Sequence, residues 1–187
     1  MFLDRHQRLH EYLERLGDGL TEAEIREPVE PGVNTLAWLL WHVARTEDGA
    51  INLLICEAPQ VLDEAWLGRL NLDREDAGTG MSIAEVVDLS ARIDLASLAA
   101  YARAVRERTR ILVASLRPPQ LDEVVSGDRI REALERMVVG PAVQKLREHW
   151  SGATKGYFLA FLPLAHNYEH IGQADLIRGL LGHPGRF

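Results

Sequence analysis

Cysteine is almost absent from this 187-residue sequence, because Cys56 is the only one. A lone cysteine excludes an internal disulfide and a cluster of thiolate metal ligands, and it suits a reducing compartment. Within an apolar helical segment, we interpret Cys56 as a small buried hydrophobe in preference to a reactive thiol. We therefore look to other side chains for metal-binding or catalytic chemistry.

Lysine and long apolar runs are scarce as well. Only Lys145 and Lys155 are lysines among the 21 basic residues, and 28 acidic residues bring the formal net charge to -7. The arginines are interleaved with acids, which is typical of solvated helix faces, and the negative balance disfavours nucleic-acid binding. No apolar run approaches the roughly 18 residues that span a bilayer. We expect no nucleic-acid partner and no membrane insertion.

The N-terminal stretch alternates charge with leucine and lacks the uninterrupted apolar core of a secretory signal peptide. Together with the single cysteine, this favours a cytoplasmic protein. Hydrophobic residues make up 47% and charged residues 26% of the sequence, which is the balance of a globular protein with a sizeable core. At this length we expect one domain over residues 1–187.

Helical periodicity runs through almost the whole sequence, and no segment shows the strict alternation of a half-buried strand. Four long helices are predicted over residues 2–16, 35–55, 95–116 and 155–181. Shorter pieces are expected in the connections, around residues 62–70, 129–138 and 142–150, with capping boxes at Thr21/Glu24 and Ser82/Glu85. Pro163 lies inside the last long helix and should bend it. The pattern predicts an all-α fold, a four-helix bundle with short extra helices.

A histidine pair in the last long helix is the most informative polar feature. His166 and His170 are four residues apart, so both imidazoles lie on one side of the helix, one turn apart. They continue an apolar stripe with Leu162 and Ile177 that must face the bundle interior. Two buried imidazoles need partners for their polar nitrogens and would repel each other if protonated. A divalent metal ion meets both needs.

His42 is the best candidate for a third ligand, because catalytic zinc sites usually take three protein ligands. It lies within residues 38–44, a segment too apolar for a histidine that merely faces solvent. Glu47 lies on the inner stripe of the same helix. It could be a fourth ligand, an acceptor for an imidazole N–H group, or a catalytic proton acceptor. The alternative for Glu47 is a buried salt bridge with an arginine.

The other histidines show weaker patterns. His6 and His10 share the four-residue spacing, but we interpret His6 as a half-buried packing residue and His10 as a surface residue. His149 and His183 stand in polar or terminal contexts and are expected to be exposed.

Two alternatives to a three-histidine metal site stay open. Residues 166–170 match H-x-x-E-H, the motif of inverted-motif zinc peptidases, in which Glu169 would be the general base. This motif is short, and the chain is small for such an enzyme and lacks a predicted substrate-binding sheet. In the other alternative no metal is bound, and His42, His166 and His170 form a hydrogen-bonded core network.

Two segments together resemble the DinB-like superfamily. Residues 31–48 read PGVNTLAWLLWHVARTED, with His42 beside a tryptophan, and residues 166–178 read HNYEHIGQADLIR. The resemblance implies a four-helix bundle with an up-down-down-up order and frequent homodimers. It also implies a metal site in which His42, His166 and His170 bind zinc, nickel or a similar divalent ion.

Some members of this superfamily are metal-dependent transferases or isomerases that use low-molecular-weight thiols such as bacillithiol or mycothiol. The N-terminal domain of mycothiol-dependent maleylpyruvate isomerase is one of them. The resemblance therefore implies a small-molecule thiol whose thiolate the metal favours. As an enzyme, the protein would hold and deprotonate a thiol or water at the open position of the ion, and Glu47 and Glu169 are the candidate proton acceptors. The other function that it leaves open is a non-catalytic, metal-stabilised structural or stress-response module. No residue in the sequence identifies the thiol or its acceptor.

Overall fold

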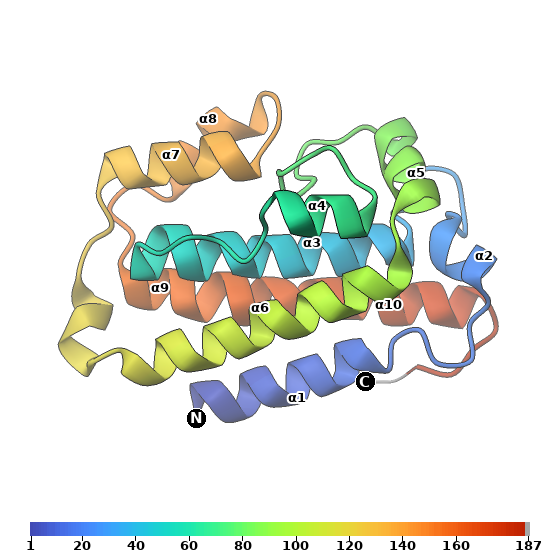
Figure 1. Cartoon of the computed structure of the whole chain (residues 1–187), viewed down its shortest axis with the longest axis horizontal. Coiled ribbons are helices and arrows are strands. Elements are labelled where there is room, and N and C mark those ends of the chain that lie inside the picture. The colour runs from blue at the N-terminus through green and yellow to red at the C-terminus, as the bar shows by residue number, and fades with distance from the viewer. Residues whose placement is uncertain (186–187) are drawn as a thin grey trace.

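Four long helical segments make up the bundle in a computed structural model, which describes residues 1–185. They are α1 (Phe2–Glu14), α3 (Leu36–Gly49) with η1 (Ala50–Cys56), α6 (Leu95–Ser115), and α9 (Lys155–Ala160) with η3 (Phe161–His166) and α10 (Asn167–Leu180). In Figure 1, α1 and the α9–α10 segment run in one direction, whereas α3 and α6 run in the other. The predicted all-α bundle and its up-down-down-up order are confirmed.

Short helices fill the connections between the long ones. They are α2 (Glu22–Arg26), α4 (Glu64–Leu70), α5 (Ile83–Arg92), η2 (Pro118–Asp122), α7 (Gly127–Met137) and α8 (Ala142–His149). In Figure 1, α4, α5, α7 and α8 gather along one side of the bundle, above α3. Contacts of α3 with both α5 and α7 make it the central helix.

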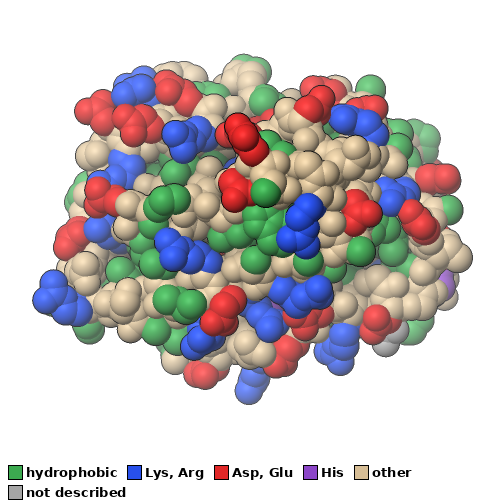
Figure 2. Space-filling model, viewed as in Figure 1, with side chains coloured by type: hydrophobic (Ala, Val, Ile, Leu, Met, Phe, Trp, Pro, Cys, Tyr) green, Lys and Arg blue, Asp and Glu red, His purple; other side chains and the backbone are tan. Residues whose placement is uncertain are grey.

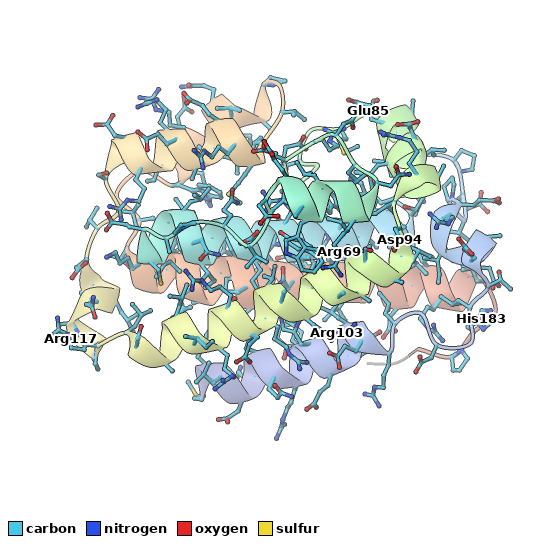
Figure 3. The ribbon with its side chains drawn as sticks, viewed as in Figure 1. Arg69, Glu85, Asp94, Arg103, Arg117 and His183 are labelled. Atoms are coloured by element: carbon cyan, nitrogen blue, oxygen red, sulfur yellow. The ribbon has the colours of Figure 1, made fainter. Side chains whose placement is uncertain are left out.

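Polar caps fix where several of these helices begin. The capping boxes of Thr21 with Glu24 and of Ser82 with Glu85 both form, as predicted. Asp94 accepts a hydrogen bond from a backbone amide in the first turn of α6, and Figure 3 shows it at that end of the helix. Such a side-chain cap satisfies a backbone amide that has no partner within the helix, so local sequence sets these boundaries.

Buried side chains of α3 include charged residues as well as apolar ones. Arg45 and Asp48 are 0% exposed and form an ion pair of 2.9 Å between Arg45 Nη1 and Asp48 Oδ2. The Tyr101 hydroxyl donates to the same Asp48 oxygen at 2.6 Å. Because each buried charge has partners, α3 can lie in the middle of the bundle without leaving a charge unpaired.

Cys56 is half-buried and packs against the apolar cluster around η1, α7 and α9. Burial raises the pKa of its thiol, which keeps it protonated at neutral pH. These features agree with its interpretation as a packing residue.

Two of the long helical segments contain a π-helical stretch, and the sequence did not predict this. Residues Ala50–Cys56 and Phe161–His166 are π-helical. Pro163 accounts for the second segment, because proline lacks an amide hydrogen and crowds the preceding turn. The expected bend therefore takes the form of a widened turn. This turn ends at His166, directly before α10. It therefore sets the direction of α10 and the position of His170 on that helix.

The surface mixes the two signs of charge. On the face in Figure 2, arginine and acidic side chains are interspersed among apolar ones. Many form ion pairs along one helix, such as Arg92 with Asp88 at 2.8 Å and Arg110 with Glu107 at 2.7 Å. Solvent screens exposed pairs of this kind, so they contribute little to the stability of the fold. In the described part of the chain, no helix has the length and hydropathy needed to cross a membrane.

Candidate metal centre

The three histidines predicted from the sequence meet between α3 and the last long helical segment. The Nε2 atom of His42 lies 3.2 Å from that of His166, and the Nε2 atom of His170 lies 3.1 Å from the same His166 atom. His42 comes from α3, His166 from the end of η3, and His170 from the first turn of α10. Residues 124 positions apart in the chain therefore share one small volume.

Each imidazole of this group, here called the His42 triad (His42, His166 and His170), has an oxygen acceptor at its other nitrogen. The acceptors of the three Nδ1 atoms are the Ala77 carbonyl for His42 at 2.5 Å, Asn167 Oδ1 for His166 at 3.3 Å and Gln173 Oε1 for His170 at 3.1 Å. Because these oxygens only accept, each ring carries its proton on Nδ1 and leaves a lone pair on Nε2. Three lone pairs thus face one another with no proton between them.

Burial keeps the His42 triad neutral. Burial and the two neighbouring imidazoles lower the pKa of His42 to about 3. Burial and His170 lower the pKa of His166 to about 4, and burial also lowers the pKa of His170. At neutral pH no imidazolium can supply a proton to the lone pairs, so a cation is the partner that this arrangement fits.

The donor set of the His42 triad suits a divalent transition metal. Neutral imidazole nitrogen is a good ligand for zinc, nickel and copper. Tetrahedral zinc with bonds of about 2.0–2.1 Å separates its ligand nitrogens by roughly 3.3 Å. The observed separations of 3.1 and 3.2 Å are within a few tenths of an ångström of that value.

Aromatic rings surround the His42 triad and fix the planes of its imidazoles. Trp38 stacks on His42 with 4.6 Å between ring centroids, and its ring plane is nearly perpendicular to that of His170. Phe161 packs against His166 at 6.2 Å. His42 is only 4% exposed, whereas His166 and His170 are half-buried. The group is therefore open on one side, which leaves room for the additional ligand of a catalytic metal site.

Glu47 lies in a different cluster, deeper in the bundle. Its carboxylate accepts hydrogen bonds from His6 Nε2 at 2.8 Å and from His10 Nε2 at 2.9 Å. The Thr109 hydroxyl donates at 2.7 Å, and the Asn167 amide lies at 3.5 Å. Side chains from α1, α6 and α10 thus converge on one carboxylate of α3. The alternative for Glu47 was a buried salt bridge with an arginine. Among the described residues Glu47 has no arginine partner, and the two histidines, Thr109 and Asn167 bond to it instead.

The interpretations of His6 as half-buried and of His10 as a surface residue are wrong. They are 2% and 4% exposed. Their four-residue spacing places both on the face of α1 that points into the bundle, where Glu47 supplies an acceptor for each ring. The polar neighbours of His10 suggested exposure, but they lie on the other side of the helix. The signal that was missed is the combination of this pair with an acidic residue on the inner stripe of α3.

The prediction of exposure holds for one of the remaining two histidines and fails for the other. His149 is exposed, as expected. His183 is partly buried, and its Nε2 atom lies 2.9 Å from Glu24 Oε1, so the prediction of an exposed His183 is wrong.

Asn167 connects Glu47 with the His42 triad. Its Oδ1 atom lies 3.3 Å from His166 Nδ1, and its Nδ2 atom lies 3.5 Å from Glu47 Oε2. Asn167 is 0% exposed. Within residues 1–185, Glu47 therefore reaches the His42 triad only through this amide, and its catalytic role stays a prediction. Glu169, the other candidate proton acceptor, is exposed on α10.

Metal bound by the His42 triad should persist at lower pH than metal held by exposed histidines. Protons compete with metal for neutral imidazole, and pKa values of about 3 for His42 and about 4 for His166 lie well below the ordinary histidine value of about 6.5. We expect constant metal content from pH 7 to about 5 and loss toward pH 4. Elemental analysis after dialysis at stepped pH measures this. Release with a midpoint near pH 6.5 would contradict the prediction.

Comparison with known proteins agrees with this architecture. A family model described as DinB superfamily matches residues 2–174. The chain belongs to the DinB superfamily. A crystal structure of a conserved protein from Enterococcus faecalis is similar to this DinB-superfamily chain, with a TM-score of 0.70 and 21% sequence identity. The alignment covers 97% of this chain and 95% of that one, and at this identity it supports the fold alone. No curated protein matches the chain.

Proposed function

We propose that this DinB-superfamily protein is a metal-dependent enzyme that activates a low-molecular-weight thiol for group transfer or isomerisation. The observation that supports the proposal is the His42 triad, in which three imidazole lone pairs converge at 3.1–3.2 Å and one side stays open. Zinc or nickel is the metal that we propose. Such an ion would act as a Lewis acid and lower the pKa of a bound thiol, so that the thiolate is available at neutral pH.

The protein side chains would orient the site and limit the access of water. The acceptors at the three Nδ1 atoms hold each ring with its Nε2 atom directed inward. Trp38 and Phe161 cover two flanks with apolar surface. A proton released from the thiol could pass to Glu169, which is exposed one residue before His170, or to solvent on the open side. Glu47 would act indirectly, by holding Asn167 against His166.

The competing proposal is a non-catalytic module in which the His42 triad joins α3 to α10 through a metal ion. Such a site would stabilise the bundle, because the ion binds the folded chain and not the unfolded one. The half-exposed positions of His166 and His170 favour the enzyme, since structural metal sites are closed.

We also propose that the protein forms a homodimer, as the resemblance implies. Leu176 and Leu180 lie four residues apart on α10 and are 65% and 57% exposed. A second copy of the chain could cover this apolar surface.

Removal of the metal distinguishes the two functions. Bacillithiol or mycothiol would be mixed with an electrophilic aryl chloride, and thioether formation would be followed by absorbance. We expect turnover by the metal-replete protein, a loss of at least about 100-fold after dialysis against a chelator, and recovery with zinc or nickel. A metal-replete protein that turns over neither thiol but loses melting temperature on chelation would support the structural module.

A further inference from the structure

His6, His10 and Glu47, here called the α1 triad, form a second group of metal-binding side chains. Their nearest ligand atoms, two imidazole nitrogens and a carboxylate oxygen, all lie within 4.8 Å of one another. None of the three residues is more than 4% exposed. Two imidazoles and one carboxylate also form the protein ligand set of many iron and zinc enzymes. The α1 triad shares no residue with the His42 triad.

The carboxylate of the α1 triad is itself held in place by neighbours. Thr109 of α6 donates to Glu47 Oε1 at 2.7 Å, and Asn167 of α10 lies 3.5 Å from Glu47 Oε2. Metal-binding carboxylates are usually oriented by such outer hydrogen bonds, which fix the side chain before the ion arrives. The bundle therefore supplies both the ligands and their support.

The distances within the α1 triad allow an ion with small movements. The two Nε2 atoms lie 2.8 and 2.9 Å from the carboxylate oxygens, so without metal each ring donates an Nε2 proton to Glu47. An ion with bonds of about 2.1 Å at right angles separates neighbouring ligand atoms by about 3.0 Å. Each ring would then carry its proton on Nδ1 and retreat from the carboxylate by about one to two tenths of an ångström. One carboxylate would then offset half of the charge of a divalent ion.

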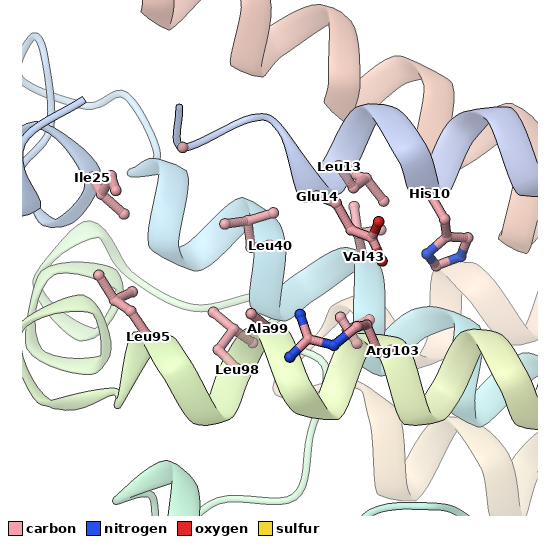
Figure 4. Close-up of a pocket in the computed structure, with 13 residues that line it drawn as sticks. His10, Leu13, Glu14, Ile25, Leu40, Val43, Leu95, Leu98, Ala99 and Arg103 are labelled. Carbon is pink, nitrogen blue, oxygen red and sulfur yellow. The ribbon is translucent and has the colours of Figure 1, made fainter. Parts of the chain in front are cut away.

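A cavity borders the α1 triad at His10. It has a volume of about 190 Å³ and lies between α1, α3 and α6. In Figure 4 the His10 ring stands at one end of the cavity, with Glu14 and Arg103 farther along its wall. Its walls are mostly aliphatic. This volume exceeds the space of several water molecules, so a water or small anion beside His10 could complete the coordination of an ion.

From these contacts we propose that the α1 triad binds a second divalent metal ion, so that each chain holds two. This inference goes beyond the thiol chemistry of the His42 triad and does not depend on it. The alternative is a permanent hydrogen-bonded cluster in which Glu47 accepts four donors and no ion enters. The two differ in the number of ions that the folded chain retains.

Cobalt(II) is a suitable probe, since its visible absorption reports on its ligands. The full chain without a histidine tag would be loaded with cobalt and dialysed against metal-free buffer, and cobalt per chain would be counted by elemental analysis. We expect two ions for the native chain and one for a His6→Gln/His10→Gln variant. A His42→Ala/His166→Ala variant should also keep one ion, with a different absorption spectrum. A His149→Gln variant, changed at an exposed histidine, should keep two.

The outcomes separate this inference from the proposed function. One ion in the native chain that the His6→Gln/His10→Gln variant also keeps, or two ions in that variant, overturns the second site. If that variant is unfolded by circular dichroism, cobalt titration of the native chain decides, because two saturating phases are expected and one phase contradicts the inference. Thiol turnover that depends on His166 but not on His10 would leave the proposed function intact in either case.

Discussion

A His166→Ala variant should lose at least about 100-fold in affinity for zinc at the His42 triad. His166 is the central ligand, because its Nε2 atom lies 3.2 Å from that of His42 and 3.1 Å from that of His170. Removal of an outer partner of a ligand already costs about 10–100-fold in affinity, and removal of the ligand itself costs more. Competition with a chromophoric chelator measures the change. Thiol turnover should fall by a similar factor.

The control for this variant is His149→Ala, which removes an exposed imidazole of α8. It should retain the affinity of the native chain within about twofold, since isolated surface histidines bind zinc weakly. Circular dichroism should show that both variants keep their helical content. A His166→Ala protein with the zinc affinity of the native chain would show that zinc does not bind at the His42 triad.

A Glu47→Leu substitution should lower the free energy of unfolding by about 3–5 kcal/mol. Urea denaturation of the chelator-treated protein measures this change. The substitution removes the acceptor for His6, His10 and Thr109, and it leaves buried polar groups without partners. Loss of one member of a buried charged network typically costs this much. Chelation matters because bound metal would add to the stability of the native chain.

Glu11→Leu is a matched control on α1, where Glu11 is exposed and its carboxylate accepts a hydrogen bond from Gln7. It should change the free energy of unfolding by no more than about 0.5 kcal/mol. Glu47→Gln should lie between the two, since it keeps the shape of the side chain and one acceptor oxygen. A loss of less than about 1 kcal/mol in Glu47→Leu would mean that the four helices do not depend on this carboxylate.

Local patterns were sufficient for most of the fold. Helix lengths follow from apolar periodicity, and caps such as Ser82 and Asp94 act within one turn, so the sequence contains them in full. The π-helical turn at Phe161–His166 is a more difficult case, because Pro163 predicts a bend but not its form. No proline marks the π-helical segment at Ala50–Cys56, and we find no local cause for it.

The two histidine clusters differ in how much the sequence reveals. His166 and His170 stand out because polar rings interrupt an apolar stripe, and His42 stands out for the same reason. His6 and His10 depend on how α1 is rotated against α3, which is a tertiary property. The partners of Glu47 come from three other helices, and no spacing within one segment could identify them.

The amide of Asn167 has only one acceptable orientation. Its oxygen faces the protonated nitrogen of His166 and its NH₂ group faces the Glu47 carboxylate. A rotated amide would set donor against donor at one end and oxygen against anion at the other. The Pro163 carbonyl, 3.4 Å from Asn167 Nδ2, favours the same orientation, so Glu47 is one of two acceptors that direct the oxygen of this amide toward His166. One uncharged side chain thus spans the space between the two histidine clusters and touches a member of each.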